Sequence, residues 1–261
     1  MKSSLSLFAL LGLAAASPCS HAHVGVVNTQ LPYAVAGKSY ELVLAVPHGC
    51  AYTDAAGAAK EADTYKIEVT TPAPFTGVRP IIEGAFGKPA RTVNGASTTF
   101  VWTKPVALDS AADDQSYRVG IRGTVAAGTE FTKLTFNAKQ TCKNPAGGAD
   151  LTRDWANYVG TDGSTSNQSP TVKVYPARTP GWNKVNLAAA NEKHTQADVK
   201  AFLNDFFGDA QVVWVGKGGY SANAATAAKI KALAAKDASY SELTENASVM
   251  IHATDDIWVK Y

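Results

Sequence analysis

Short stretches of alternating apolar and polar residues constrain the fold of this chain more than any other feature. Residues 39–47, SYELVLAVP, place Leu42, Leu44 and Val46 on one face of a predicted strand. The segment 54–63 lacks this alternation and fits either a loop or a short helical turn. Similar alternating stretches, separated by Gly, Pro, Asn and Asp, lie at 64–71, 97–103, 116–125, 133–142 and 171–175. Short strands with such turn signals predict a mainly β protein built as an antiparallel sandwich.

The pattern changes at a Pro/Gly-rich stretch that begins at Pro176. Residues 194–208 carry apolar side chains at helical spacing, and residues 221–237 fit an Ala-rich helix with Ser221 as a candidate N-terminal cap. Two short apolar stretches fit strands, at 210–216 and 255–261. The sequence therefore predicts an α+β extension over residues 179–261, either a small domain or a unit packed on the sandwich.

The first 22 residues have the features of a secretory signal peptide. Lys2 precedes an apolar run of about a dozen residues, which is too short to span a bilayer. Ser20-His21-Ala22 fits the small-x-small cleavage pattern, so we expect an exported chain that begins at His23. Two alternatives remain open: a lipid anchor at Cys19, and cleavage after Ser20.

The charge and the cysteines are consistent with a soluble periplasmic protein. The formal net charge is only +2, which implies neither a nucleic acid nor a charged membrane surface as a partner. No second long apolar run follows the leader, so we do not expect a membrane-embedded chain. Cys50 and Cys142 remain after the leader is removed, and an even pair in an exported protein favours a disulfide.

A free N-terminal histidine is a chelator. The α-amine of His23 and its ring Nδ1 can bind one metal ion together, and the amine has a low reference pKa, about 7.7–8.0. Amine and imidazole nitrogens suit Cu(II). The amine is an amide before cleavage, so export itself would create this ligand. The alternative is that His23 is only the first solvated residue of the mature chain.

His48 is a second candidate ligand. It follows the end of a predicted strand and stands two residues before Cys50. A His-Gly-Cys sequence can itself hold a metal, but a disulfide would remove the sulfur of Cys50 from that role. The alternative for His48 is a hydrogen-bonded loop histidine.

Several motifs follow one another in a distinctive order: His23-Val24, then VPHGC, TTFVW, LTFNAKQTC, a tryptophan, and SPTVKV. In this order they resemble the YcnI-like copper-binding family of exported bacterial proteins, over about residues 23–178. The later stretches GWNKV, VVWVGKGGYSAN and IWVKY look like the C-terminal region of the longer proteobacterial members.

The resemblance implies an immunoglobulin-like sandwich that holds one Cu(II) ion. In the family the N-terminal histidine binds through its amine and Nδ1, a carboxylate after the Val-Pro strand end adds an oxygen, and a tryptophan lies over the metal. His23 and Trp155 match the histidine and the tryptophan. This chain departs from the family at the carboxylate, because His48 follows the Val-Pro pair. His48 could take that place as a second imidazole, or Glu41 or Asp54 could reach the metal.

We therefore expect a non-enzymatic periplasmic Cu(II)-binding protein that acts in copper homeostasis or delivery, with other periplasmic or membrane copper-handling proteins as possible partners. A CopC-type copper carrier is one alternative. A copper-dependent polysaccharide monooxygenase is another, and its second equatorial histidine could be His48. It would also need a flat exposed aromatic surface, which we do not expect, since we place four further tryptophans in the core: Trp102, Trp182, Trp214 and Trp258.

Overall fold

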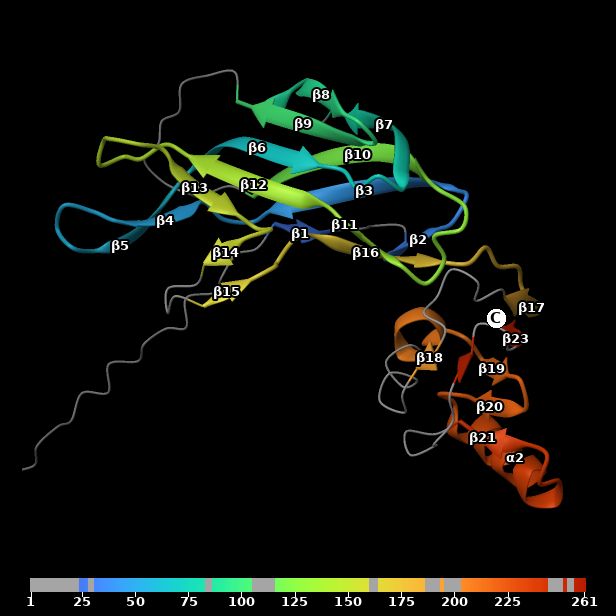
Figure 1. Cartoon of the computed structure of the whole chain (residues 1–261). Coiled ribbons are helices and arrows are strands. Elements are labelled where there is room, and N and C mark those ends of the chain that lie inside the picture. The colour runs from blue at the N-terminus through green and yellow to red at the C-terminus, as the bar shows by residue number, and fades with distance from the viewer. Residues whose placement is uncertain are drawn as a thin grey trace, which may run out of the picture.

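The structure is a computed structural model of the whole chain (Figure 1). It describes residues 24–27, 31–82, 86–104, 116–159, 164–185, 193–194, 203–243, 251–252 and 256–261. These residues form a β-sandwich and a smaller C-terminal unit, which lies at one end of the sandwich in Figure 1. No helix in these described ranges is long and apolar enough to cross a membrane.

The first sheet of the sandwich is antiparallel and has the order β1-β3-β10-β7. Its strands are β1 (Gly25–Val26), β3 (Ser39–Val46), β10 (Tyr117–Val125) and β7 (Phe75–Ile81). Leu42, Leu44 and Val46 on β3 are at most 1 % exposed, as the alternation predicted. This sheet therefore buries the face that the sequence pattern selected.

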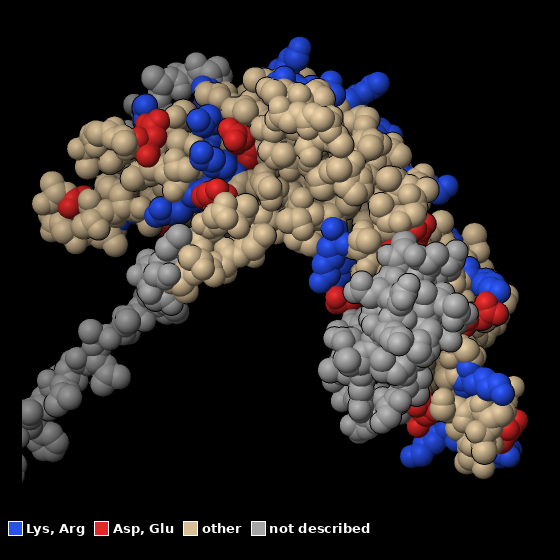
Figure 2. All heavy atoms as spheres, in the orientation of Figure 1, with Lys and Arg blue, Asp and Glu red and all other residues tan. Residues whose placement is uncertain are grey.

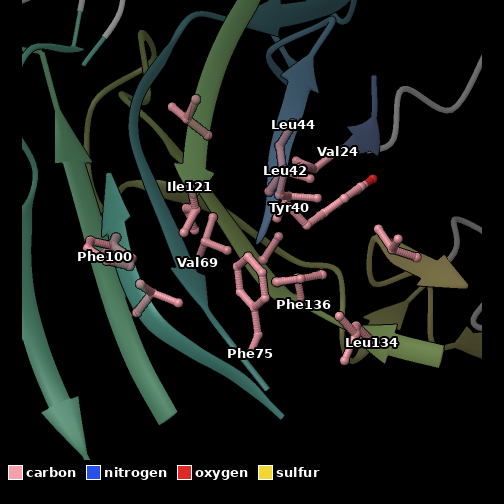
Figure 3. Close-up of a cluster of buried hydrophobic side chains, with 14 of the residues drawn as sticks. Val24, Tyr40, Leu42, Leu44, Val69, Phe75, Phe100, Ile121, Leu134 and Phe136 are labelled. Carbon is pink, nitrogen blue, oxygen red and sulfur yellow. The ribbon is translucent and has the colours of Figure 1, made fainter. Parts of the chain in front are cut away.

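The second sheet is also antiparallel and has the order β13-β12-β6-β9-β8. Its strands are β13 (Leu151–Asp154), β12 (Asn137–Cys142), β6 (Thr64–Thr70), β9 (Ser97–Thr103) and β8 (Ala90–Asn94). Figure 3 shows side chains such as Phe75, Ile121 and Phe136 gathered in one cluster, and the rings of Phe75 and Phe136 meet edge to face at 5.5 Å. The two sheets thus share one core.

The predicted strand 133–142 is two strands. β11 (Lys133–Thr135) pairs with β16 (Thr171–Tyr175), which pairs in parallel with β2 (Tyr33–Val35). After β11 the chain leaves this small sheet at Phe136, whose amide donates to the carbonyl of Pro170, and continues as β12. Sandwich corners are made by segments that switch sheets, and the alternation of side chains does not reveal the switch.

The segment 54–63 belongs to a β-hairpin: residues 54–58 form its turn, but residues 59–62 are a strand, so the assignment to a loop or helical turn was wrong there. β4 (Cys50–Thr53) pairs with β5 (Ala59–Ala62). The turn depends on Asp54, whose Oδ1 accepts hydrogen bonds from the amides of Ala56 and Ala58 at 2.9 and 2.8 Å. A further short hairpin joins β14 (Tyr158–Val159) to β15 (Thr165–Ser166).

The C-terminal unit has an α+β composition, as expected. Its sheet has the order β17-β23-β19-β20-β21. The elements are β17 (Trp182–Val185), helical residues 203–207, β19 (Val212–Val215), β20 (Gly218–Tyr220), α2 (Ala224–Lys236), β21 (Ser241–Glu242) and β23 (Ile257–Lys260), with the pair β18 (Lys193–His194) and β22 (Ile251–His252). The cap of α2 is Asn223, whose side chain accepts from the amide of Thr226. The candidate cap Ser221 instead donates to the carbonyl of Gln211.

This unit packs directly on the sandwich. Phe131 and Tyr175 of the sandwich share a buried cluster with Phe206 and Phe207. The hydroxyl of Tyr175 donates to the carbonyl of Asp205 at 2.7 Å. Burial and nearby charged groups raise the pKa of Tyr175 to about 12, so the hydroxyl remains a donor at neutral pH. The C-terminal unit thus has a buried cluster of its own, and this cluster includes residues of the sandwich.

Candidate functional site

The residue that follows His23 is fixed in the core at one end of β3. β1 runs antiparallel to β3 with Gly25 opposite Ala45, so the register leads Val24 to the level of Val46. Val24 is only 2 % exposed. His23 itself lies outside the described residues, but a single peptide bond, about 3.8 Å between Cα atoms, joins it to Val24. A ligand at position 23 is therefore attached where β3 ends.

His48 follows that same end of β3 and is held through its backbone. Its carbonyl accepts a 2.7 Å hydrogen bond from Nε2 of Gln140, a buried side chain of β12. Two residues later, Cys50 is bonded to Cys142 with an S–S distance of 2.07 Å. The predicted disulfide is confirmed. The sulfur of Cys50 is thus not a thiolate ligand, and His48 remains as the candidate donor of the His-Gly-Cys sequence.

Glu61 is the carboxylate that lies beside His48. Oε2 of Glu61 is 3.4 Å from Nδ1 of His48, and the two side chains are 41 % and 46 % exposed. Glu61 comes from β5, where it lies opposite Ala51 of β4. A carboxylate beside one ring nitrogen can orient an imidazole so that its other nitrogen faces a metal. The pair therefore offers an oriented nitrogen donor at the surface.

Sequence reasoning missed Glu61 because it assigned residues 54–63 to a loop or helical turn. The available signal was Asp54 followed by Gly57, a combination typical of a turn between two short strands. Once the hairpin is recognised, Glu61 must return alongside the residues that follow His48. Its pairing with the imidazole still depends on the tertiary structure.

The two carboxylates that the sequence suggested, Glu41 and Asp54, have other partners than His48. Glu41 lies on the outward face of β3, opposite Arg122 of β10, and its Oε1 is 3.7 Å from Nη1 of that arginine. Five residues separate Glu41 from Val46, a distance of about 17 Å along a strand. The structure thus does not support Glu41 as a ligand. Asp54 is occupied by the turn hydrogen bonds described above.

Trp155 is a buried and firmly held side chain. It is 3 % exposed, and its ring stacks on Tyr158 with centroids 5.3 Å apart and planes 9° apart. Its amide donates to the carbonyl of Ala138. Trp155 belongs to the same buried cluster as Val24 and Val46, and Figure 1 shows the end of β13 near the start of β1. The tryptophan is therefore fixed in the cluster that anchors the N-terminal residues.

A buried polar network lies at this end of the first sheet, where Tyr117 of β10 is opposite Val46. Nζ of Lys104 is 2.6 Å from Oδ2 of Asp63, and the hydroxyl of Tyr117 donates to Oδ1 at 2.9 Å. Lys104 also hydrogen-bonds the hydroxyl of Tyr117 and lies 3.9 Å from the centroid of its ring. The Asp63 carboxylate already has a cationic partner, so it is a structural group rather than a metal ligand.

The described residues alone do not form a closed metal site. Among them, no group of three or more His, Cys, Asp and Glu side chains could hold a metal ion. His48 and Glu61 provide one imidazole and one carboxylate, and such nitrogen and oxygen donors suit Cu(II). Basic and acidic side chains are mixed around the β4–β5 end of the sandwich on the face that Figure 2 shows. A complete site needs the further donors that His23 would supply.

Comparison with known proteins finds only distant structural similarities. No protein-family model and no curated protein matches the chain. An uncharacterized protein from Nocardia farcinica with an immunoglobulin-like fold is 18 % identical, and the match covers 57 % of this chain and 97 % of that one with a TM-score of 0.41. The assignment of an antiparallel sandwich rests on the strand pairing of this chain itself.

Two other solved structures are similar at a lower level. A cohesin module from a Clostridium perfringens family 33 glycoside hydrolase is 10 % identical, over 60 % of this chain and 99 % of that one, with a TM-score of 0.28. The Actinomyces fimbrial adhesin FimA is 13 % identical, over 59 % of this chain and 53 % of that one, with a TM-score of 0.29. Neither likeness bears on what this chain binds.

Proposed function

We propose that this chain is an exported, periplasmic Cu(II)-binding protein that acts in copper homeostasis or delivery, with His23 as its first residue and main ligand. The observation that best supports the proposal is the register of β1 on β3. It buries Val24 at the end of β3, which leads into His48. Copper is the cargo of the protein in this proposal.

His23 would supply two different nitrogen donors from one residue, its α-amine and its ring Nδ1. The α-amine must lose its proton to bind copper, which its low reference pKa makes easy. The ring Nδ1 completes a chelate with the amine. Because Val24 is packed in the core, little freedom of the attached backbone remains to be lost when the metal binds, and such preorganisation favours affinity.

His48 would add a further nitrogen, with Glu61 as the residue that orients it. The carboxylate of Glu61 faces Nδ1, so Nε2 is the donor in this arrangement. Trp155 would shield the bound ion with its ring rather than donate to it. Its fixed position in the cluster of Val24 supports this role.

The decisive experiment alters only the N-terminus. Mass spectrometry of the purified periplasmic protein should find a chain that begins at His23. A variant with one glycine added before His23 should bind Cu(II) more than about 100-fold more weakly, because even residues behind the ligands contribute 10–100-fold to metal affinity. Its thermal unfolding should be unchanged. If the extended protein binds Cu(II) as tightly as the native one, the chelate proposal is wrong.

A second set of variants tests the other donors. His48→Ala should remove one nitrogen coupling from the electron paramagnetic resonance spectrum of the copper-loaded protein. Glu61→Gln should keep that coupling and weaken binding by about 10-fold or more. Glu41→Gln is the matched control, since it removes an ion-paired carboxylate at the far part of β3 and should change neither affinity nor spectrum. An unchanged spectrum in His48→Ala would exclude His48 from the site.

A further inference from the structure

The sheet of the C-terminal unit has one buried face and one outward face, and α2 covers part of the outward face, where Ile230 approaches Gly219. Along β23, Ile257 and Val259 are fully buried, whereas Trp258 between them is 42 % exposed. On β17, Trp182 is 51 % exposed. The expectation that Trp182 and Trp258 lie in the core was therefore wrong, and Trp214 of β19 is only partly buried. Exposed tryptophans on a regular sheet are unusual, since this side chain is highly buried on average.

The strand register places three indoles together on the outward face. Trp258 lies opposite Trp214 of β19, which gives a Cβ–Cβ separation of about 5 Å. Trp182 lies opposite Lys260, two residues along β23 from Trp258, and such diagonal neighbours are about 7–8 Å apart. The three strands are neighbours in the order β17-β23-β19. We call Trp182, Trp258 and Trp214 the tryptophan face.

One end of the tryptophan face is fixed by packing. Trp214 lies opposite Gly219 of β20, and a Cβ at this glycine would be 2.9 Å from the indole and from Cγ2 of Ile230 on α2. The ring of Tyr240 meets Trp214 edge to face at 6.0 Å. The indole therefore covers a glycine and is bounded by a helix. A ring held in this way loses little freedom when a ligand stacks on it.

Charged groups alternate with the indoles. Lys260 is opposite Trp182, and Lys184 is opposite Trp258. Nζ of Lys184 is 2.7 Å from Oδ1 of Asp256 and 5.8 Å from the ring centroid of Trp258. The face is thus a row of flat apolar rings with hydrogen-bonding groups between them, and one of its lysines is already neutralised.

This pattern fits one class of ligand better than the others. The cores of protein–protein interfaces are depleted in lysine, so a dry contact with a protein or a second copy fits poorly. An anionic membrane surface would favour lysines without carboxylate partners, whereas Lys184 is paired. A sugar ring has an apolar C–H face and a rim of hydroxyls, which match an indole flanked by an ammonium and a carboxylate. A flat sheet with successive rings suits an extended chain of such units.

We propose that the tryptophan face binds a neutral, extended, β-linked polysaccharide by stacking sugar rings on Trp182, Trp258 and Trp214. This site is separate from the proposed copper site. The C-terminal unit packs on Tyr33 and Tyr175, near the start of β3, whereas His48 lies beyond its other end. The eight residues of β3 span about 25 Å. The face would tether the protein to a polymer without presenting that polymer to the copper.

The test uses the whole mature protein. Binding of cellohexaose and chitohexaose is measured by tryptophan fluorescence and by calorimetry. Binding to insoluble cellulose and chitin is measured by co-sedimentation. At least one of the two hexasaccharides should bind. Trp258→Ala and Trp182→Ala should each weaken binding about tenfold, as expected for the loss of one stacked ring. Ile82→Ala is the control, because it removes a 62 % exposed apolar side chain of the sandwich. Circular dichroism should be the same for all variants.

Several outcomes would overturn the proposal. In the first two, the protein binds neither polymer, or the Trp182→Ala/Trp258→Ala double variant binds as tightly as the wild type. In the other two, the protein instead sediments with phosphatidylglycerol vesicles, or it forms a dimer that Trp258→Ala dissociates. Binding should also be the same with and without Cu(II), and in the protein extended before His23. The polysaccharide proposal and the copper proposal can therefore be refuted independently of each other.

Discussion

Loss of the Cys50–Cys142 disulfide should remove a large part of the stability of the sandwich. The bond closes a loop with a sequence separation of 92 residues. In the chain-entropy model, a loop of this length stabilises the folded state by about 4.6 kcal/mol at 25 °C. Both cysteines are fully buried beside Ala62, and they join the start of β4 to the end of β12. The cross-link therefore connects the His48 segment to the second sheet.

The measurement is urea denaturation of the wild type and of the Cys50→Ala/Cys142→Ala double variant, followed by tryptophan fluorescence. With an m-value of about 3 kcal/mol per molar urea, the midpoint should fall by about 1.5 M. Dithiothreitol should shift the wild type by a similar amount and should not shift the double variant. A midpoint change below about 0.3 M, or two free thiols in the denatured unreduced protein, would refute the reasoning.

Two further predictions concern the joint between the sandwich and the C-terminal unit. The guanidinium of Arg178 lies 4.4 Å from the ring centroids of Tyr33 and Tyr261 and 2.8 Å from Asp209. Arg178→Ala should therefore destabilise this contact by about 2 kcal/mol and speed proteolytic release of the C-terminal unit. Arg178→Lys should keep only part of that stability, because an ammonium cannot reproduce the planar guanidinium contacts. Release of the unit from Arg178→Ala at the wild-type rate would contradict this. The second prediction concerns acid. Burial acts to raise the pKa of Asp205, but Lys173 and Lys133 lower it below its ordinary value overall. The stabilisation is then complete above the ordinary carboxyl pKa and is lost as the pH falls through the lowered one. The difference in thermal unfolding midpoint between the wild type and Asp205→Asn should therefore be present at pH 6 and vanish in acid; a difference that does not change with pH would show that Asp205 does not act through its charge.

The sequence predicted the strands β3, β6, β9, β10 and β16 from local alternation, but it did not predict β7, β8 or β13. The burial of Leu42, Leu44 and Val46 follows directly from side chains that alternate along a strand. The prediction failed where two strands follow each other without a turn signal. Lys133–Thr135 and Asn137–Cys142 read as one alternating run, although they belong to different sheets. A change of sheet conserves the alternation, so only the partners of each strand show it.

The candidate ligands of the proposed site come from the sequence, and they stay predictions. His23 and His48 were identified from their chemistry and from their places beside a cleavage signal and a strand end. The choice of carboxylate was not predictable, since Glu41 and Glu61 are both solvent-accessible glutamates near predicted strands. The structure pairs Glu41 with Arg122 and places Glu61 beside the imidazole of His48. Cross-strand register decides both pairings, and register is a property of the assembled sheets.

By itself, the sequence determined the antiparallel β class and the cysteine pair, and it predicted a chelating N-terminal histidine, which stays a prediction. The core position expected for Trp102 is confirmed, but the tertiary structure alone decided that Trp182 and Trp258 are exposed. Alternation divides the side chains of a strand between two faces, but it does not say which of those faces another layer will cover. In the C-terminal unit, Val213, Val259 and Ile257 share a buried cluster with Phe206 and Phe207, and Trp182 and Trp258 are left exposed to solvent.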